Sequence, residues 1–234
     1  MKIKRFTFDK LFRKIRVALF KEEVITGDKR QKIIDDFNVL FYNEGGPDCK
    51  WFGFDMIKYP TDLMIYQEII YETKPDIIIE TGTHKGGSAL YFANLFDIRG
   101  YGEVISIDIN KREDFPKHKR ITYLTGRSDK KEILDKLKFI CAEGRKVMVI
   151  LDSDHDYKTV LDELKNYSKF VSKDCYLIVE DSNINGHPVH KQFGKGPYEA
   201  IEEFMKDNKD FKIEKSRERF LLTANPNGFM RRIK

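Results

Sequence analysis

The sequence predicts an α/β fold, with a mostly parallel sheet of seven strands and helices on both faces. Apolar, β-branched runs alternate with helix-like segments from residue 76 onward, and such alternation is typical of parallel strands joined by helical crossovers. The first run, IIIE, breaks directly into a glycine-rich turn. Two short strand-like segments near the end indicate an antiparallel pair that closes the sheet.

Hydrophobic spacing and the residues that interrupt it give the individual elements. The expected parallel strands are 77–79, 103–109, 121–124, 146–151 and 175–179. The expected closing pair is 211–213 with 219–223. Helices are expected at 29–41, 61–72, 88–96, 130–142, 157–170 and 197–208. Pro75 ends the second helix, because the residue before a proline is disfavoured in helical geometry.

The chain is expected to comprise a helical extension over 1–60 and one sheet-containing domain over 61–234. In the extension, apolar residues recur at helical spacing among lysines and arginines, namely Phe8, Leu11, Phe12, Ile15 and Leu19. This basic amphipathic helix is expected to pack on its own domain or on another subunit, which makes a homo-oligomer plausible. The alternative is peripheral contact with an anionic membrane. Residues 51–60 are interpreted as an aromatic-rich linker.

Composition and charge exclude several classes of protein. Hydrophobic residues make up 41% and charged residues 35% of the chain, no apolar run approaches the ~18 residues of a membrane span, and no signal peptide is visible. These observations predict a cytoplasmic protein. Residues 1–32 carry eleven Lys or Arg and four acids, a net +7 against +5 for the whole chain. The remainder is therefore not basic, which argues against a nucleic-acid substrate.

The glycine-rich turn after the first strand has the sequence Glu80-Thr-Gly82-Thr-His84-Lys-Gly86. A turn of this kind aims backbone N–H groups and a helix N-terminus at a nucleotide-like ligand. Dinucleotide-binding proteins need a glycine where this chain has His84, so NAD and FAD are disfavoured. Asp108 ends the second strand, where a carboxylate can bind both hydroxyls of a ribose. A purely structural turn and a strand-capping acid are the alternative interpretations.

Three further carboxylates end the next two strands. Asp152 follows VMVIL, and Glu180 and Asp181 follow YLIV. Adjacent acids repel unless a cation compensates them, and hard oxygen ligands favour Mg²⁺. His155 could take a proton from a substrate hydroxyl held by the metal, or could serve a structural role in its loop. The long loop after Asp181, residues 182–197, is expected to be a lid or binding loop.

Several ordered motifs together resemble the cephalosporin hydroxylase / rhamnosyl O-methyltransferase family over about residues 51–232. They are IIETGTHKGGSAL, VISIDI, VMVILDSDH, LIVEDSNINGHPV, FGKGPYEAIEEF and RERFLLTANPNGFMRR. The resemblance implies a Rossmann-like class I methyltransferase fold that binds S-adenosylmethionine and Mg²⁺. By position, the implied cofactor contacts are Glu80, Gly82, Thr83, His84, Lys85, Gly86, Ser88, Asp108, Ser128 and Asp152. The implied metal ligands are Asp152, Glu180 and Asp181.

The family resemblance sets the expected activity. The related catechol-type O-methyltransferases have Asp-Asn in place of Glu180-Asp181, and a lysine base in the place of His155. The sequence therefore predicts a metal-dependent O-methyltransferase acting on a hydroxyl of a small molecule or sugar, with Asp152 and His155 as catalytic residues. One alternative is a hydroxylase-like Fe(II) oxygenase, although its usual site needs two histidines and a carboxylate. The other is a non-catalytic cofactor-binding or assembly protein.

Overall fold

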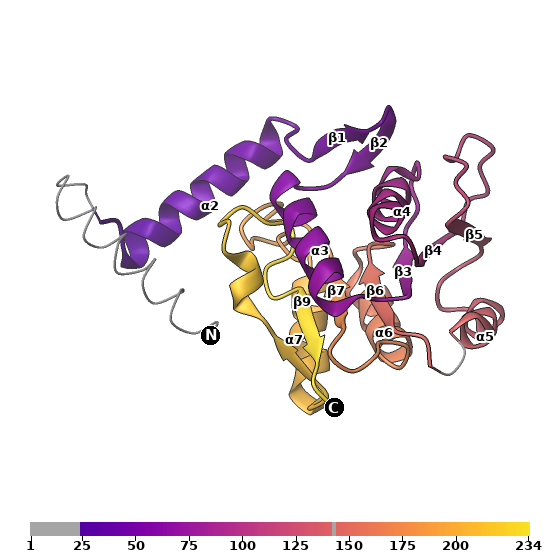
Figure 1. The fold of residues 1–234 in the computed structure, drawn as a ribbon. Coiled ribbons are helices and arrows are strands. Elements are labelled where there is room, and N and C mark those ends of the chain that lie inside the picture. Colours follow the sequence, from indigo (N-terminus) through magenta and orange to yellow (C-terminus); the bar gives the residue numbers. More distant parts are fainter. Residues whose placement is uncertain (1–23, 142–143) are drawn as a thin grey trace, which may run out of the picture. The chain divides into compact units, whose positions relative to one another are not determined.

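The computed structural model describes residues 24–141 and 144–234. Its main sheet has seven strands in the order β5-β4-β3-β6-β7-β9-β8 (Figure 1). The parallel strands are β3 (Ile77–Thr81), β4 (Glu103–Asp108), β5 (Ile121–Thr125), β6 (Val147–Leu151) and β7 (Tyr176–Val179). The antiparallel strands are β8 (Phe211–Ile213) and β9 (Phe229–Arg232). The predicted fold class, a mostly parallel seven-stranded sheet with helices, is confirmed.

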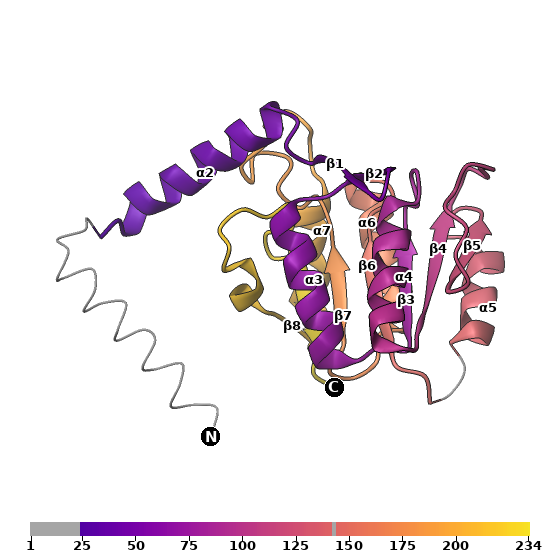
Figure 2. The same ribbon diagram turned by 45° about the horizontal axis from the view of Figure 1, so that its top comes forward.

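Helices cover both faces of this sheet (Figure 2). Alternate side chains of a strand point to opposite faces, so Ile77 and Ile79 pack with α5 (Lys131–Ile140), α6 (Tyr157–Tyr167) and α7 (Pro197–Asp207). Ile78, between them, packs with α3 (Pro60–Thr73) and α4 (Gly87–Arg99). All five residues of β3 are buried, which explains the run of three isoleucines with which the strand begins.

The order of the strands fixes where a ligand can bind. From β3 the chain moves outward through β4 to β5, and it then returns to place β6 on the other side of β3. This reversal leaves a crevice between the carboxyl ends of β3 and β6, the usual ligand site of open α/β sheets. The glycine turn begins at Gly82, directly after β3, and Asp152 directly follows β6.

A two-stranded hairpin replaces the expected linker before α3. It consists of β1 (Asp48–Trp51) and β2 (Phe54–Ile57). Phe52 and Gly53 form its loop with positive φ angles of 47° and 89°, as a type I′ hairpin turn requires at both central residues. The hairpin packs on the start of α4, where a Cβ at Gly87 would overlap the backbone of Asp55.

The expected strand 219–223 is not a strand, because side chains of α3 bind this segment. Asp62 accepts hydrogen bonds from the Thr223 hydroxyl at 2.6 Å and the Ala224 N–H at 2.8 Å. Thr61 donates to the Leu222 carbonyl at 2.5 Å. The short 3-10 helix η1 (Lys215–Glu218) precedes this segment, and β9, six residues later, pairs with β7 and β8.

The amino-terminal part divides from the rest. Residues up to Asp36 and residues from Phe37 to Lys234 form separate compact units, so helix α2 (Gly27–Asn43) crosses the boundary. The amphipathic helix expected around Phe8 to Leu19 lies outside the described residues. No helix in the described ranges is long and apolar enough to cross a membrane. The division into an extension over 1–60 and a domain over 61–234 remains a proposal.

Candidate active site

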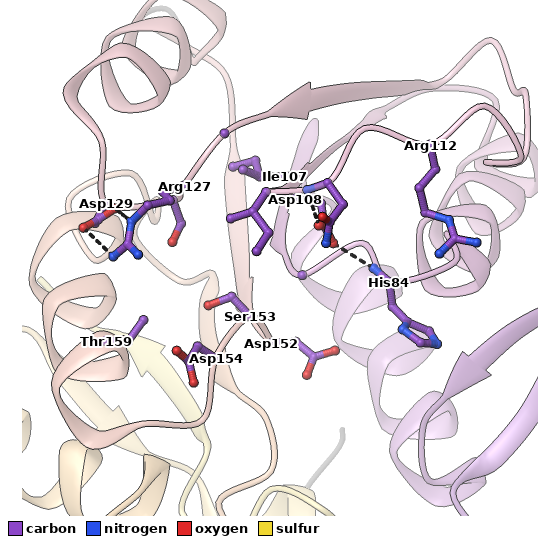
Figure 3. A pocket seen from close by; sticks show the side chains of 15 residues that line it. His84, Ile107, Asp108, Arg112, Arg127, Asp129, Asp152, Ser153, Asp154 and Thr159 are labelled. Carbon is purple, nitrogen blue, oxygen red and sulfur yellow. Dashed lines mark hydrogen bonds and ion pairs between the residues drawn. The ribbon is translucent and has the colours of Figure 1, made fainter.

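A pocket of about 350 Å³ opens at the carboxyl edge of the sheet, a size typical of small-molecule sites. Figure 3 shows Asp108 along one side of this pocket and Asp152 with Ser153 along the other. Five of the residues predicted to contact the cofactor line it: Gly82, His84, Asp108, Ser128 and Asp152. The other five do not belong to its lining, and they are Glu80, Thr83, Lys85, Gly86 and Ser88.

The turn after β3 binds the carboxylate of Asp108. One carboxylate oxygen accepts hydrogen bonds from the backbone N–H groups of Thr83 and His84, each at 3.0 Å, and the bond from His84 is drawn in Figure 3. The other oxygen accepts from the Asn110 N–H at 2.8 Å. A carboxylate offers about four lone-pair sites, so Asp108 retains acceptor capacity toward the pocket.

Glu80 lies beneath the turn and is fully buried. Its Oε2 accepts from the Ser106 hydroxyl at 2.7 Å, and Oε1 has no hydrogen-bond partner within the described ranges. Burial raises the pKa of Glu80 to about 7, although the charge of Lys58 and hydrogen bonds from Ser88 and Ser106 oppose that rise. Glu80 therefore supports the turn from below.

The three acids predicted to bind metal follow adjacent strands and have different partners. Lys58, with a side chain only 3% exposed, forms ion pairs with Asp152 and, at 2.9 Å, with Glu180 Oε2. The other oxygen of Glu180 accepts from the Tyr66 hydroxyl at 2.8 Å. Both oxygens of Glu180 are thus engaged, because a buried carboxylate needs compensating donors.

Asp181 instead faces His155, with 3.1 Å between Oδ2 and the ring Nε2. Its φ of 51° is a left-handed conformation that aspartate tolerates better than most residues. Asp152, His155 and Asp181 each offer one ligand atom, and these atoms lie within 4.8 Å of one another. This arrangement of oxygen and imidazole donors suits a divalent cation. The structure therefore groups two of the three predicted ligands with the predicted base.

Burial and the close approach of these acids shift the pKa values of Asp181 and Lys58. Burial, together with the negative charge of Asp152, raises the pKa of Asp181, whereas His155 lowers it. Burial alone would lower the pKa of Lys58, but attraction to Asp152, Glu180 and Glu80 outweighs it and raises that pKa well above the usual range. Lys58 is therefore a permanent cation among the acids.

The long loop after Asp181 contacts the residue before α3 and the start of α7. Asn183 is 1% exposed and donates to the Tyr59 hydroxyl at 3.1 Å, while its Oδ1 has no partner within the described ranges. His187 is bound to Glu199 at 3.0 Å and stacks on Tyr198 with 3.7 Å between ring centroids. These contacts give His187 a structural role in the loop.

Sequence reasoning missed three residues that shape the site. Lys58 follows the hairpin, Tyr66 lies on α3, and Glu163 lies on α6, where it is fully buried and accepts from the Ser153 hydroxyl at 2.7 Å. No motif marks any of them. The available signals were the placement of a lone lysine just before Pro60 and the four-residue spacing of Asp62 and Tyr66, which places both on one face of α3.

A parallel sheet with a pocket and an acidic cluster at its strand-order reversal belongs to the Rossmann-like α/β class. Residues 46–233 match the family Rhamnosyl O-methyltransferase/CmcI, and the chain belongs to this family. The family predicted from the sequence is thereby confirmed, and with it the expected class of enzyme, an O-methyltransferase.

Two relatives and one solved structure illustrate the similarity. The Rhamnosyl O-methyltransferase of Mycobacterium leprae (strain TN) is 39% identical over 186 residues, covering 77% of this chain and 81% of that protein. The Rhamnosyl O-methyltransferase of Mycobacterium tuberculosis (strain ATCC 25618 / H37Rv) is 39% identical over 189 residues, covering 77% and 76%. A structure of CmcI with Mg and SAM is 20% identical, with a TM-score of 0.61, covering 80% and 77%. The similarity to the CmcI structure, at this level of identity, concerns the fold alone.

Proposed function

We propose that this protein transfers a methyl group from S-adenosylmethionine to a hydroxyl of a sugar or another small molecule, with the help of Mg²⁺. One observation carries the proposal: Asp152 both lines the pocket and belongs to the group of potential metal ligands. A cofactor in the pocket and a cation at the acids would therefore be neighbours. Family membership and the rhamnosyl-specific names of the relatives support a sugar hydroxyl as acceptor.

The cofactor contacts proposed for the pocket follow from its lining. The remaining acceptor site of Asp108 suits a ribose hydroxyl, and Gly82 lines the pocket without a side chain that would occupy it. Ser128 and His84 line the same pocket. Glu80, Thr83, Lys85, Gly86 and Ser88 are proposed to act through the shape of the turn.

The residues around the acids fit a hard divalent ion. Asp152 and Asp181, with Glu180 beside them, would hold it, and a bound ion would lower the pKa of the acceptor hydroxyl. His155 would take the hydroxyl proton at its ring nitrogen. These residues would hold the acceptor oxygen near the methyl carbon, and such positioning can supply ~7–11 kcal/mol of barrier lowering. The cluster has one histidine and two carboxylates, whereas Fe(II) oxygenases use two histidines and one carboxylate.

Calorimetry and turnover test this proposal together. S-adenosylmethionine and MgCl₂ are titrated into the full-length protein separately, and S-adenosylhomocysteine release is then measured with a rhamnosyl glycoside and with catechol as acceptors. Binding of both ligands and release with the glycoside are expected. Release with catechol alone would assign a phenolic acceptor, and absence of binding by either ligand would favour the non-catalytic alternative.

The basic amino-terminal segment suggests a second property. We propose that residues 1–28 mediate contact with an anionic membrane or with another subunit, because the excess of positive charge lies within 1–32. Deleting residues 1–28 should abolish flotation with phosphatidylserine vesicles, or reduce the subunit number, while leaving cofactor binding intact. Unchanged flotation and unchanged mass would contradict both roles.

A further inference from the structure

Lys58 is a buried cation fixed between two of the acids proposed to bind metal. Its ammonium group pairs with Asp152 and Glu180, and its side chain is 3% exposed. Charged lysines are almost never fully buried unless they are paired. Removing one partner of such a pair leaves an uncompensated buried charge, which is strongly destabilising.

Hydrogen bonds on both sides hold the backbone of Lys58 in place. Its N–H donates to the Pro47 carbonyl at 3.0 Å, and its own carbonyl accepts a 3.6 Å hydrogen bond from the Cys49 thiol. Two residues later Pro60 begins α3. The hairpin and the helix thus fix the backbone of Lys58 from both sides, while its two ion pairs hold the ammonium group at the acids.

The charges of the three acids and Lys58 leave a net charge that one divalent cation can neutralise. Asp152, Glu180 and Asp181 contribute three negative charges, and Lys58 contributes one positive charge. One divalent cation then neutralises the remainder. The ammonium group of Lys58 repels a nearby divalent cation substantially, even at an effective dielectric constant of ~20. Without Lys58, the cation would face three uncompensated carboxylates and would bind more tightly.

We propose that Lys58 is a positioning residue that holds Asp152 and Glu180 in place in the metal-free protein and weakens the binding of divalent cations. This inference rests on the proposed metal dependence. Lys58 occupies carboxylate oxygens of Asp152 and Glu180 that a metal ion would otherwise compete for, so the ion binds reversibly to a site that is already ordered. Tyr66 supports the same arrangement, since it binds the other oxygen of Glu180 and accepts a 2.8 Å hydrogen bond from Asn225.

The test compares Lys58→Met with the wild-type protein by calorimetric titration of MgCl₂ into metal-free, full-length protein. We expect the variant to bind Mg²⁺ about tenfold more tightly or better. Its melting temperature without metal should fall, and Mg²⁺ should raise it by more than in the wild type. A merely structural role for Lys58 would weaken metal binding or leave it unchanged, and either result would overturn the proposal.

Arg217→Met provides the matched control. Arg217 is also a buried cation and forms an ion pair with Glu72. It makes none of the contacts described for Asp152, Glu180 and Asp181. This variant should lose stability without any change in Mg²⁺ affinity. If Lys58→Met is unfolded without metal, the melting curve at saturating MgCl₂ decides: folding restored by Mg²⁺ supports the proposal, and a chain that stays unfolded overturns it. Wild-type protein that binds no Mg²⁺ would refute the metal dependence itself, whereas equal binding by both proteins would refute only the role of Lys58.

Discussion

Gly82, in the turn after β3, lies directly against the backbone carbonyl of Asp152 at the end of β6. A Cβ at Gly82 would overlap that carbonyl oxygen, and φ at Gly82 is 86°. The turn can therefore approach the neighbouring strand only with glycine at this position. This contact joins the pocket to the acidic cluster.

Gly82→Ala should reduce affinity for S-adenosylmethionine by at least about tenfold, because the new Cβ would overlap the Asp152 carbonyl oxygen and the turn must move away from β6 to relieve this overlap. Calorimetry measures this loss. Gly100→Ala is the control, since Gly100 has a similar φ of 85° but no atom within 4 Å of a Cβ. It carries the backbone strain without the overlap and should bind normally. Equal losses in the two variants would show that strain, not proximity to Asp152, is responsible.

Asp108→Ala should weaken S-adenosylmethionine binding by about 10- to 100-fold, because hydrogen bonds to charged groups contribute about 1.5–3 kcal/mol each. The variant also frees the N–H groups of Thr83 and His84, which Asp108 now binds. Asp135→Ala, which removes an exposed acid of α5, is the control in the same titration. Unchanged affinity in Asp108→Ala would show that the ribose does not lie at the end of β4.

Asp152→Ala should abolish turnover, whereas His155→Ala should lower it by about 10²–10⁴-fold, the usual contribution of a general base. Asp152 contributes to both the pocket and the metal-type cluster, while His155 belongs to the cluster but not to the lining of the pocket. Release of S-adenosylhomocysteine at saturating MgCl₂ measures both rates. The ranking is wrong if the two variants retain the same residual rate.

Asp62 should make stability depend on pH. Burial raises the pKa of Asp62 to about 7, and repulsion by Asp181 adds to the effect. The unfolded value is about 3.9, so between these two values the folded protein binds more protons than the unfolded chain. The free energy of unfolding therefore falls as pH rises from about 4 to 7, by at most about 4 kcal/mol for this group.

Asp62→Asn should flatten this decline while keeping an acceptor oxygen for the Ala224 N–H, and its NH2 group can donate to the Thr223 hydroxyl instead of accepting from it. Urea denaturation of the metal-free proteins at several values between pH 4.5 and 8 measures the difference between variant and wild type. Glu80, whose pKa is likewise raised to about 7, is present in both proteins and cancels in the comparison. Parallel stability curves would contradict a raised pKa at Asp62.

Local sequence was sufficient to predict most of the fold. The β-branched run of β3, the apolar run of β6 and the helical spacing of α6 encode buried strands and amphipathic helices directly. The hairpin of β1 and β2 was missed because its turn places Phe52, rather than the usual Asn or Asp, at a positive φ. The segment 219–223 has strand-like residues, but Asp62, more than 150 positions earlier, binds it instead.

The candidate site was predictable where each residue follows directly from a strand. Asp108, Asp152, Glu180 and Asp181 end predicted strands, so the parallel topology places them at one edge. Lys58 could not be found this way, because a lysine after an exposed strand residue is ordinarily solvated. Only tertiary packing of the hairpin and α3 buries it beside Glu180.

The account depends most on a divalent ion at Asp152 and Asp181 beside the cofactor pocket. Crystals grown with MnCl₂ and S-adenosylhomocysteine allow an anomalous difference map to locate the ion. The account predicts a manganese peak within coordination distance, roughly 2.0–2.5 Å, of carboxylate oxygens from both residues, with the nucleoside near Asp108. A map with the nucleoside bound and no peak between Asp152 and Asp181 would contradict it.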